Sequence, residues 1–205
     1  MRRFNPLWIL VLALLLFPEC GDKKKPTQSQ EPCFDFPNSV GSSWHYRRYQ
    51  VSDLFDSDTT EILDSTTGVD TLLGGREVKK WLCVSASEAS SSTYVFVDQE
   101  GVWQYMSLSD TIHYHAILEF PPYVGKVRYH EFSKDSVLAI ETVSVPAGVF
   151  EGCYKIRLYD RVPMPHIPRD IETWFKSGVG IVKRREDFYT LRMNIYEELT
   201  SFQVK

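Results

Sequence analysis

The sequence lacks the short motifs that mark the common catalytic and cofactor-binding sites. It contains no P-loop, no dinucleotide fingerprint, no G-x-S-x-G nucleophile elbow and no ordered calcium-loop pattern. It has only four cysteines, and none stands in C-x-x-C spacing, so neither a redox pair nor a structural zinc site is indicated. Nothing in the chain argues for an enzyme, a cofactor or a metal, and we expect a non-catalytic protein.

The chain also lacks an excess of positive charge. Its formal net charge is −4 at pH 7, and removing residues 1–19, which hold two arginines and one glutamate, changes this to −5. A mildly acidic domain has no electrostatic reason to bind nucleic acid, so we exclude nucleic acid as a partner.

The apolar run at the N-terminus, Leu7 to Phe17, is too short to span a bilayer comfortably. It follows Arg2 and Arg3, as the apolar part of a secretory signal does, so residues 1–19 are interpreted as a signal peptide. The pattern is similar to a lipoprotein signal, in which Cys20 becomes the acylated first residue. Such signals favour a small residue before the cysteine, whereas here Glu19 stands there. A plain secreted protein and an uncleaved anchor are the alternatives.

Residues 20–32 are predicted to be a flexible tether, because this polar, lysine-containing stretch cannot bury a core. We place the protein in the cell envelope, lipid-anchored to a bacterial membrane on its periplasmic side or at the surface; secretion is the alternative. Residues 33–205 are expected to form a single β-rich domain. The membrane, contacted through the N-terminal lipid, is the first expected partner.

The stretch from Val143 to Leu158 predicts a strand, a tight turn and a second strand. Pro146 suits the second position of a turn and ends a ladder, and Gly148 follows where a type I turn favours glycine. Apolar and polar residues then alternate with the period of a strand. Gly178 to Gly180 marks a second tight reversal.

Other short strands are separated by turn residues every 8–12 positions, which is typical of an antiparallel all-β domain. We expect a meander curled into a half-barrel or a sandwich. Ile112 to Glu119 is the single stretch for which a short helix is expected. The predicted strands are 44–51, 59–66, 77–86, 93–98, 102–108, 126–132, 137–145, 153–161, 170–175, 180–186 and 189–203.

The phrase F-P-x-x-V-G occurs twice, at Phe36 to Gly41 and at Phe120 to Gly125. A G-V pair also recurs, at Gly101 and at Gly178. The chain can therefore be read as a duplicated unit, 36–119 and 120–205, unless the phrase is a common strand entry that recurs by chance.

Candidate ligands for a metal are few. His113 and His115 would share one face of a strand, but a site needs further ligands that the sequence does not supply. The acidic residues of 53–64 lack the calcium-loop order and are interpreted as a solvated connection. The proline-rich stretch 162–168 is the most unusual loop. Its Met164, His166 and Ile167 are a candidate contact surface, or else they pack on the domain's own core.

Cys33, Cys83 and Cys153 remain if Cys20 is acylated, and an exported protein can form a disulfide. Cys83 and Cys153 both sit early in a strand that follows a glycine turn, whereas Cys33 borders the tether. The favoured pair is therefore Cys83 with Cys153.

Three phrases resemble a group of uncharacterised bacterial envelope proteins, the DUF3108-like (TapB-like) families, which are related to the LolA/LolB lipoprotein-carrier fold. They are V-P-A-G-V-F-E-G-C-Y-K-I at 145–156, W-F-K-S-G-V-G-I-V-K at 174–183 and E-L-T-S-F at 198–202. The resemblance implies an antiparallel half-barrel with an apolar concave face. Its motifs are structural turns, so no functional residue is carried over.

These observations predict a non-catalytic envelope binding or assembly module. Its ligand would be a lipid chain or another apolar ligand, or the apolar part of an envelope partner protein. A structural surface-interaction protein with a closed core is the alternative, and a hydrolase without a local motif is the third reading. An open groove lined by aromatic side chains would favour the first, a filled interior the second, and clustered polar groups with shifted pKa values the third.

Overall fold

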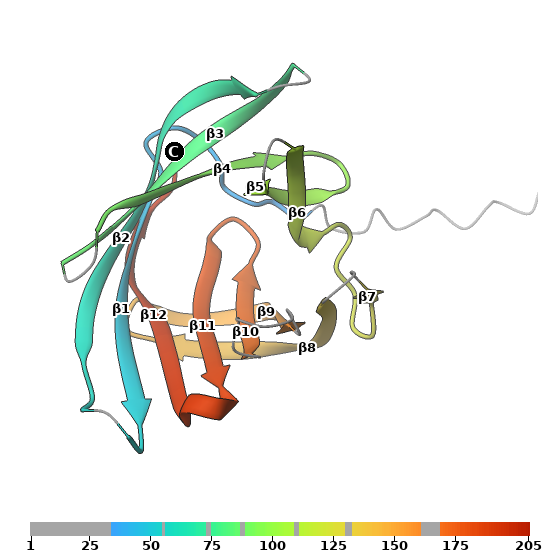
Figure 1. Ribbon diagram of the computed structural model, residues 1–205. Coiled ribbons are helices and arrows are strands. Elements are labelled where there is room, and N and C mark those ends of the chain that lie inside the picture. The colour runs from blue at the N-terminus through green and yellow to red at the C-terminus, as the bar shows by residue number, and fades with distance from the viewer. Residues whose placement is uncertain are drawn as a thin grey trace, which may run out of the picture. The chain divides into compact units, whose positions relative to one another are not determined.

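The computed structural model describes residues 34–54, 56–72, 75–86, 89–108, 111–129, 133–160 and 169–205. These residues form twelve strands and one short 3-10 helix (Figure 1). In chain order they are β1 (Ser43–Ser52), β2 (Thr59–Leu72), β3 (Arg76–Ser85), β4 (Ser91–Val97), β5 (Gly101–Leu108), β6 (Thr111–Glu119), β7 (Val127–Tyr129), β8 (Ser133–Val145), β9 (Gly148–Asp160), β10 (Arg169–Lys176), β11 (Gly180–Phe188), η2 (Tyr189–Leu191) and β12 (Met193–Gln203).

All twelve strands belong to one antiparallel sheet, in the order β6-β5-β4-β3-β2-β1-β12-β11-β10-β9-β8-β7. Consecutive strands pair with each other, except β6 and β7, and β1 pairs with β12 at the centre. The order begins at β6 and ends at β7, so the sheet is open. The expected antiparallel all-β meander is confirmed.

The expected helix at Ile112 to Glu119 is wrong. These residues belong to β6, which pairs with β5 along its length, for example Tyr114 with Tyr105. The physical reason is that β5 offers a free edge whose backbone groups need partners, and aromatic residues and isoleucine suit a pleated surface.

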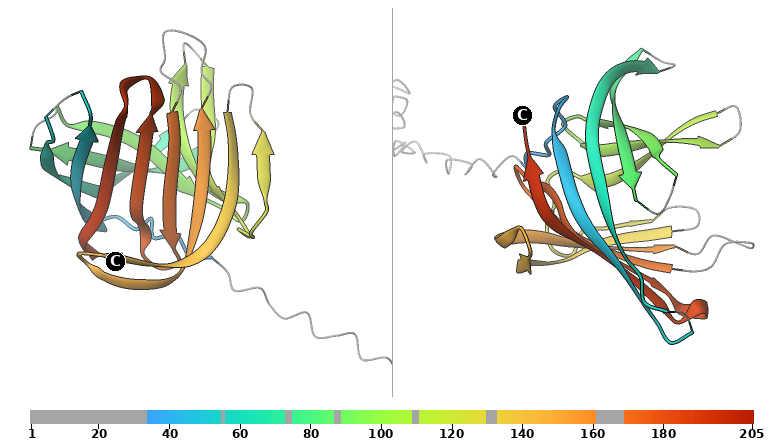
Figure 2. Two further views of the ribbon diagram at one scale, coloured as in Figure 1. Left: turned by 90° about the horizontal axis from the view of Figure 1, so that it is seen from below. Right: turned by 90° about the vertical axis from the view of Figure 1, so that its left-hand side faces the viewer.

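The sheet curls so far that its two halves contact each other (Figure 2). Val95, Val102 and Leu118 from β4, β5 and β6 join Ile156 and Phe175 from β9 and β10 in one buried cluster. The tip of the β8–β9 hairpin folds across the end of the sheet, where Ala147 N–H donates to the Leu199 carbonyl at 2.9 Å. The fold is therefore a curled, open half-barrel with an inner and an outer face.

The two ends of the half-barrel differ. In an antiparallel meander, the strand ends that follow β1, β3, β5, β7, β9 and β11 all lie at one end, which we call the open end. The buried clusters gather toward the opposite end, which we call the closed end. There Phe36 stacks near Trp81 and Phe175, with ring centroids 6.0 and 6.4 Å away.

The two predicted tight turns are present. Pro146 and Ala147 join β8 to β9, and residues 177–179 join β10 to β11. Gly148 and Gly178 have φ of 140° and 75°, a region that a side chain makes costly. A Cβ at either glycine would meet nothing within 4 Å, so it is the backbone conformation that requires glycine there.

The two F-P-x-x-V-G phrases make the same hydrogen bonds. Gly41 N–H donates to Thr66 O at 2.8 Å, and Gly125 N–H donates to Val137 O at 2.9 Å. The residue after each glycine closes a turn: Ser42 N–H donates to the Ser39 carbonyl, and Lys126 N–H donates to the Tyr123 carbonyl. The carbonyls of Ser42 and Lys126 then accept from the N–H groups of Thr66 and Val137. Each predicted repeat contributes six strands, β1–β6 and β7–β12. This similarity supports the duplicated reading, which stays a prediction.

Candidate functional site

The inner face of the central strands is arranged in three rows that run across the sheet. Side chains alternate between faces along each strand, so the register places every second residue of β10, β11, β12 and β1 in these rows. From the closed end outward, the sealed row is Phe175, Val182, Leu199, Tyr46 and Ile62. The charged row is Thr173, Arg184, Glu197, Arg48 and Thr60. The rim row is Leu158, Ile171, Glu186, Ile195 and Gln50.

The sealed row is part of a packed core. Val182 and Leu199 are fully buried, and so is Trp44 next to them. Trp44 stacks on Trp81 at 4.7 Å between ring centroids and donates from Nε1 to the Val179 carbonyl at 2.6 Å. The tryptophan rings of this region therefore fill the interior and do not line an open groove.

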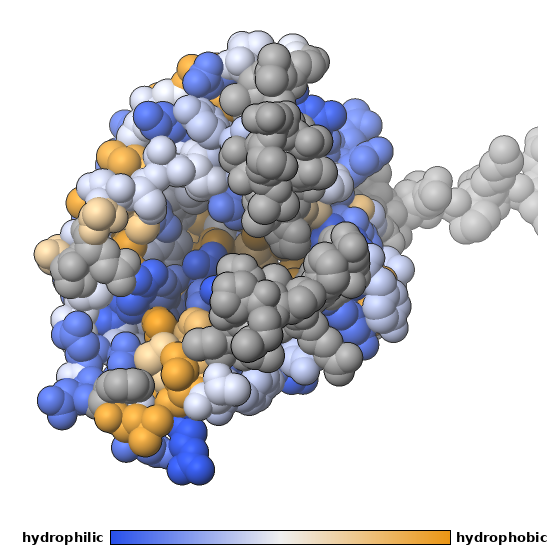
Figure 3. Space-filling view, viewed as in Figure 1, coloured by the Kyte–Doolittle hydropathy of each residue, from blue (hydrophilic) through white to orange (hydrophobic). Residues whose placement is uncertain are grey.

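In the charged row, one carboxylate lies between two guanidinium groups. Arg48 donates from Nε and Nη2 to Oε1 of Glu197 at 2.9 and 2.6 Å, and Arg184 donates from Nη1 to Oε2 at 3.4 Å. Glu197 is 9% exposed, whereas the Arg184 side chain is 33% exposed. Within the described part of the chain, Nη1 alone of the Arg184 nitrogens has a hydrogen-bond acceptor. We call the space in front of the charged row and the rim row, on the concave side of the sheet, the hollow (Figure 3).

Asp64 and Cys83 are a directly opposed pair on β2 and β3, and Asp64 pairs with Trp44 on β1, on the closed-end side of the sealed row. Its charge nevertheless acts on Arg184 and Glu197 of the charged row. Burial raises the pKa of the Asp64 carboxyl, although the Cys83 thiol donates a hydrogen bond to it. Burial and the Asp64 charge together raise the pKa of the Cys83 thiol to about 12. At neutral pH the thiol is protonated, so it is a hydrogen-bond donor and a poor nucleophile.

The rim row brings aliphatic side chains next to the charges. Leu158, Ile171 and Ile195 are partly exposed, and Glu186 stands between the two isoleucines. Figure 3 looks into the hollow and shows hydrophilic side chains at its centre with hydrophobic ones beside them. The accessible inner face thus offers a polar layer that can exchange hydrogen bonds and an aliphatic edge that can contact an apolar group.

The outer face of the same strands carries a ladder of charges. Glu198 accepts hydrogen bonds from Arg47 at 3.3 Å and from Lys183 at 3.1 Å. Trp174 lies between two ammonium groups, with Nζ of Lys155 4.9 Å and Nζ of Lys183 5.9 Å from its ring centroid. Trp174 itself is buried, and the charged groups around it pair with one another on the outward side of the strands.

Two further polar clusters lie away from the hollow. Asp170, 7% exposed, accepts from Arg157 and from the Tyr189 hydroxyl on the outer face, and its Oδ1 has no hydrogen-bond partner within the described residues. A small cleft lies where β6 meets β7, and there Arg128 donates to Glu119 Oε1 at 2.8 Å and to Ala116 O at 2.9 Å. Arg128 also pairs with Asp135. The charged groups of the cleft satisfy one another.

Several predicted site residues lie outside the described residues. These are Cys20 of the lipidation signal and Met164, His166 and Ile167 of the contact loop. The flanking strands place the ends of that loop, Asp160 and Arg169, at the open end. Lipidation and the contact loop stay predictions.

The two predicted disulfide partners are free thiols in the structure. Cys83 donates to Asp64, and Cys153 is fully buried and donates to the Phe150 carbonyl at 3.4 Å. The structure therefore does not contain the predicted bond, because each thiol serves a different acceptor on a different part of the sheet.

His113 and His115 lie on β6, opposite Met106 and Gln104. Within the described residues, no group of three or more potential metal ligands comes together. In that same part of the chain, no helix is long and apolar enough to cross a membrane.

Arg48, Arg184 and Glu197 were not singled out from the sequence. One signal is present in retrospect: in I-Y-E-E-L at 195–199, Glu197 takes the position in the alternation that Ile195 and Leu199 occupy. A charged residue at an inward-facing position marks a candidate site, but only after the face of the strand that points inward is known. The sequence does not say which distant strand supplies its partner.

No protein-family model matches the sequence, and no curated protein matches it. The fold is similar to that of a candidate lipoprotein from Parabacteroides distasonis, with a TM-score of 0.51 and 15% identity, covering 85% of this chain and 100% of that one. A candidate exported protein with a YmcC-like fold, from Bacteroides fragilis, gives a TM-score of 0.47 and 16% identity, covering 83% of this chain and 99% of that one. At these identities the likeness is one of fold.

Proposed function

We propose that this protein is an exported, lipid-anchored envelope protein that binds an amphiphilic ligand in the hollow of its half-barrel without transforming it. The observation that carries the proposal is the position of the charged row. The Arg48 and Arg184 side chains are 26% and 33% exposed, and the buried carboxylate of Glu197 lies between them, with a sealed core on one side and an aliphatic rim on the other. A fold that needed only stability would have no reason to keep three charges on an inner face, since buried ion pairs contribute little stability over apolar packing.

The charge balance of the hollow limits the ligand. Three guanidinium groups and three carboxyls share this region. Arg48 and Arg184 pair with Glu197, and Arg169 pairs with Glu186. The third carboxyl is that of Asp64, so no strong excess of either sign is present. We expect the polar part of the ligand to be uncharged and rich in hydrogen-bonding groups, because a polyanion would meet the carboxyls. Its apolar part would lie on Leu158, Ile171 and Ile195.

The absence of catalysis is part of the proposal. The hollow contains one thiol, Cys83, among the described residues, and its pKa is raised to about 12, which is opposite to the activation that a nucleophile needs. The carboxyl with the raised pKa, Asp64, hydrogen-bonds that same thiol and no histidine is among the groups that shift it.

The proposed location of the protein in the cell envelope is supported by two independent observations. The N-terminal signal ends at Cys20, and the similar structure from Parabacteroides distasonis is described as a candidate lipoprotein. Kinship with the DUF3108-like families is retained as part of the proposal on the strength of the shared turn phrases.

The anchor is tested by replacing Cys20. We expect Cys20→Ala to move the protein from the membrane fraction to the soluble fraction of its own cells, as followed by immunoblotting. A variant that stays in the membrane as before would contradict acylation and would leave Leu7 to Phe17 as the anchor.

The hollow is tested by comparing Arg184 with its neighbour on the other face. Wild type, Arg184→Met and Arg185→Met are purified gently from their own membranes, and bound compounds are measured by native mass spectrometry. We expect wild type and Arg185→Met to carry the same bound mass and Arg184→Met to lose most of it. Arg185 is a matched control because it also pairs with carboxylates, Glu172 and Asp187.

The structural alternative rests on the sealed row and on Trp44 and Trp81 packed beside it, which show how much of the interior is filled. This alternative predicts that wild type, Arg184→Met and Arg185→Met all carry no bound compound. Equal occupancy in all three would place a ligand elsewhere and would contradict the hollow as its site.

A further inference from the structure

We infer that the outer face around β7 is a membrane-contacting surface that rests in the headgroup region of a lipid bilayer. We call it the aromatic edge. Its members are exposed apolar or aromatic residues of β7, of the turn before it and of β8: Tyr123, Val124, Val127, Tyr129 and Leu138.

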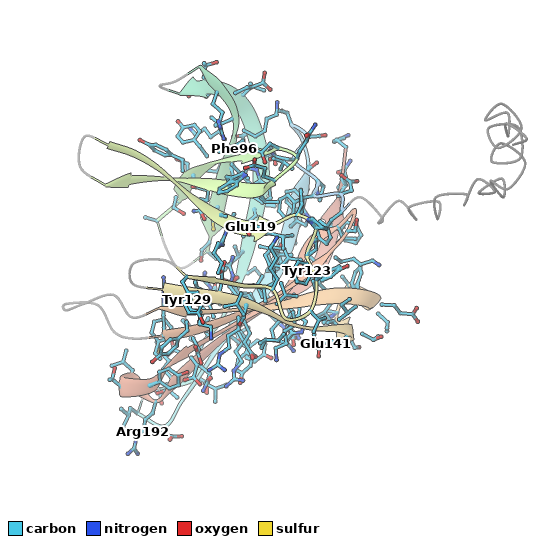
Figure 4. The ribbon with its side chains drawn as sticks, turned by 90° about the vertical axis from the view of Figure 1, so that its right-hand side faces the viewer. Phe96, Glu119, Tyr123, Tyr129, Glu141 and Arg192 are labelled. Carbon is cyan, nitrogen blue, oxygen red and sulfur yellow. The ribbon has the colours of Figure 1, made fainter. Side chains whose placement is uncertain are left out.

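The register places these side chains on one face. Val127 pairs with Ser136 and Tyr129 pairs with Lys134, so both project outward, while Arg128 between them projects toward Asp135. Tyr123 and Val124 belong to the turn closed by Lys126 N–H and the Tyr123 carbonyl at 3.1 Å. Figure 4 looks onto this edge and labels Tyr123 and Tyr129 along it. The two tyrosines are 58% and 75% exposed, which is high for aromatic residues.

Each exposed tyrosine is accompanied by a lysine. Nζ of Lys126 lies 5.7 Å from the Tyr123 ring centroid, and Nζ of Lys134 lies 5.5 Å from that of Tyr129. Tyrosine is enriched at membrane interfaces, where its ring sits at headgroup level, and lysine can keep its stem in that layer while its ammonium meets phosphate. The combination fits a lipid surface better than a dry protein interface, from which lysine is depleted.

The polar groups beneath the edge are already paired. Arg128 pairs with Asp135 and Glu119, and Lys126 also reaches Glu119 at 3.4 Å. Contact with the low-dielectric lipid layer would therefore leave none of these charged groups without a partner. The outer face of β10, β11 and β12 is different, because a dense charge ladder covers it, and it would resist the same layer.

The point where the described chain begins adds an independent argument. The Phe34 ring lies 5.5 Å from that of Phe120 and 5.7 Å from that of Tyr154. Phe120 is three residues before Tyr123, so the described chain begins near the aromatic edge. Residues 20–33 can span at most about 50 Å when fully extended, so an acylated Cys20 would hold this edge within reach of the bilayer.

A second copy of the chain is the competing occupant. Strand β7 has three residues, which is short for a strand that would template pairing with another edge. We therefore commit to the lipid surface and treat self-association as an outcome of the test.

The test uses the chain from residue 20 to 205 with Cys20→Ser, so that no acyl group contributes. Flotation is measured with vesicles of phosphatidylcholine alone and with phosphatidylglycerol added. We expect the parent to bind both and Tyr123→Ser combined with Tyr129→Ser to bind about tenfold more weakly to each. Leu54→Ser, at an exposed residue of the β1–β2 connection, should bind as the parent does.

Two further variants keep the result interpretable. Val124→Ser changes an exposed turn residue and should weaken binding in the same direction if the double variant folds poorly. Replacing Lys23, Lys24 and Lys25 with serine should remove only the additional binding to phosphatidylglycerol, since that part comes from the tether.

The inference is overturned if the parent does not float, or if the tyrosine and Leu54 variants bind equally. It is also overturned if analytical ultracentrifugation finds a dimer that the tyrosine changes dissociate. Ligand occupancy of the hollow should be the same in all these variants, so the outcome is separable from that of the proposed function.

Discussion

The inner and outer faces of the central strands carry the same residue types at adjacent positions. Arg48, Arg184 and Glu197 point inward, whereas Arg47, Arg185 and Glu198 point outward. Both carboxylates accept from two cations, and both are similarly shielded, with side-chain exposures of 11% and 13%. The difference between the faces lies in what stands opposite: the curled sheet surrounds the inner set, whereas the outer set lies on the convex side of the sheet.

The carboxyl pKa values report this difference. On the outer face, burial disfavours the charge of Glu198, but hydrogen bonds and charge from Lys183 and Arg47 outweigh it and hold its pKa below the usual value. On the inner face, burial dominates at Asp64 and raises its pKa. The strength of an ion pair on a sheet therefore cannot be ranked by residue type or distance alone, because the surroundings decide whether the pKa of its carboxyl is raised or lowered.

The largest expected effect is on thiol reactivity. The pKa of Cys83 is raised to about 12 from an ordinary 9.0, so we expect it to react with iodoacetamide at least about a hundredfold more slowly than an outward thiol on the same strand. The comparison thiol is Val84→Cys in a Cys83→Ser background, and labelling is followed by peptide mass spectrometry. Equal rates at the two positions would remove the distinction between the faces.

The second effect is on stability. Glu197→Ala leaves two guanidinium groups on the inner face without their shared carboxylate, and we expect a loss of about 3 kcal/mol in the free energy of unfolding. Glu198→Ala leaves Arg47 and Lys183 without this carboxylate, but their side chains are 44% and 25% exposed and can be solvated, so the change should cost about 1 kcal/mol or less. Urea unfolding of both variants measures the difference. Similar losses would mean that the hollow screens charge as well as bulk water does.

The smallest expected effect is on the pH dependence of stability, and it has opposite signs on the two faces. The raised pKa of Asp64 contributes stability at low pH that is lost as pH rises through its folded-state value, so Asp64→Asn should gain about 1 kcal/mol at pH 7 and nothing at pH below about 4. The lowered pKa of Glu198 contributes stability above the ordinary carboxyl pKa that is lost on acidification. Glu198→Gln should therefore lose stability at pH 7 and change little at low pH.

Thermal unfolding across that pH range decides this prediction. If Asp64→Asn is less stable than wild type at pH 7, its hydrogen bond with Cys83 outweighs desolvation, and the assignment of the inner face as the costly environment is wrong.

The strands and turns of this fold are encoded locally, and the sequence shows them. Pro146 with Gly148 and the reversal at Gly178 specify hairpins without help from distant residues, and the alternating pattern after each turn indicates a strand. The helix expected at Ile112 to Glu119 failed because a free neighbouring edge overrides weak local preference.

The candidate site could not be predicted in the same way. Arg48 and Glu197 are 149 residues apart and meet only because β1 pairs with β12. Their inward direction further depends on which way the sheet curls. Alternation within one strand shows that Glu197 shares a face with Leu199, but the meaning of that face belongs to the whole sheet.

The pairing of β1 with β12 also limits the order in which the strand pairs can form during folding. Every other pair in the sheet joins strands that follow one another along the chain, so each can form as soon as its second strand is available. The central pair joins Ser43–Ser52 to Met193–Gln203, so its hydrogen bonds and the ion pair between Arg48 and Glu197 must wait for the last strand and close the longest loop. If the chain is exported as proposed, the hollow would form only after β12 has crossed the membrane.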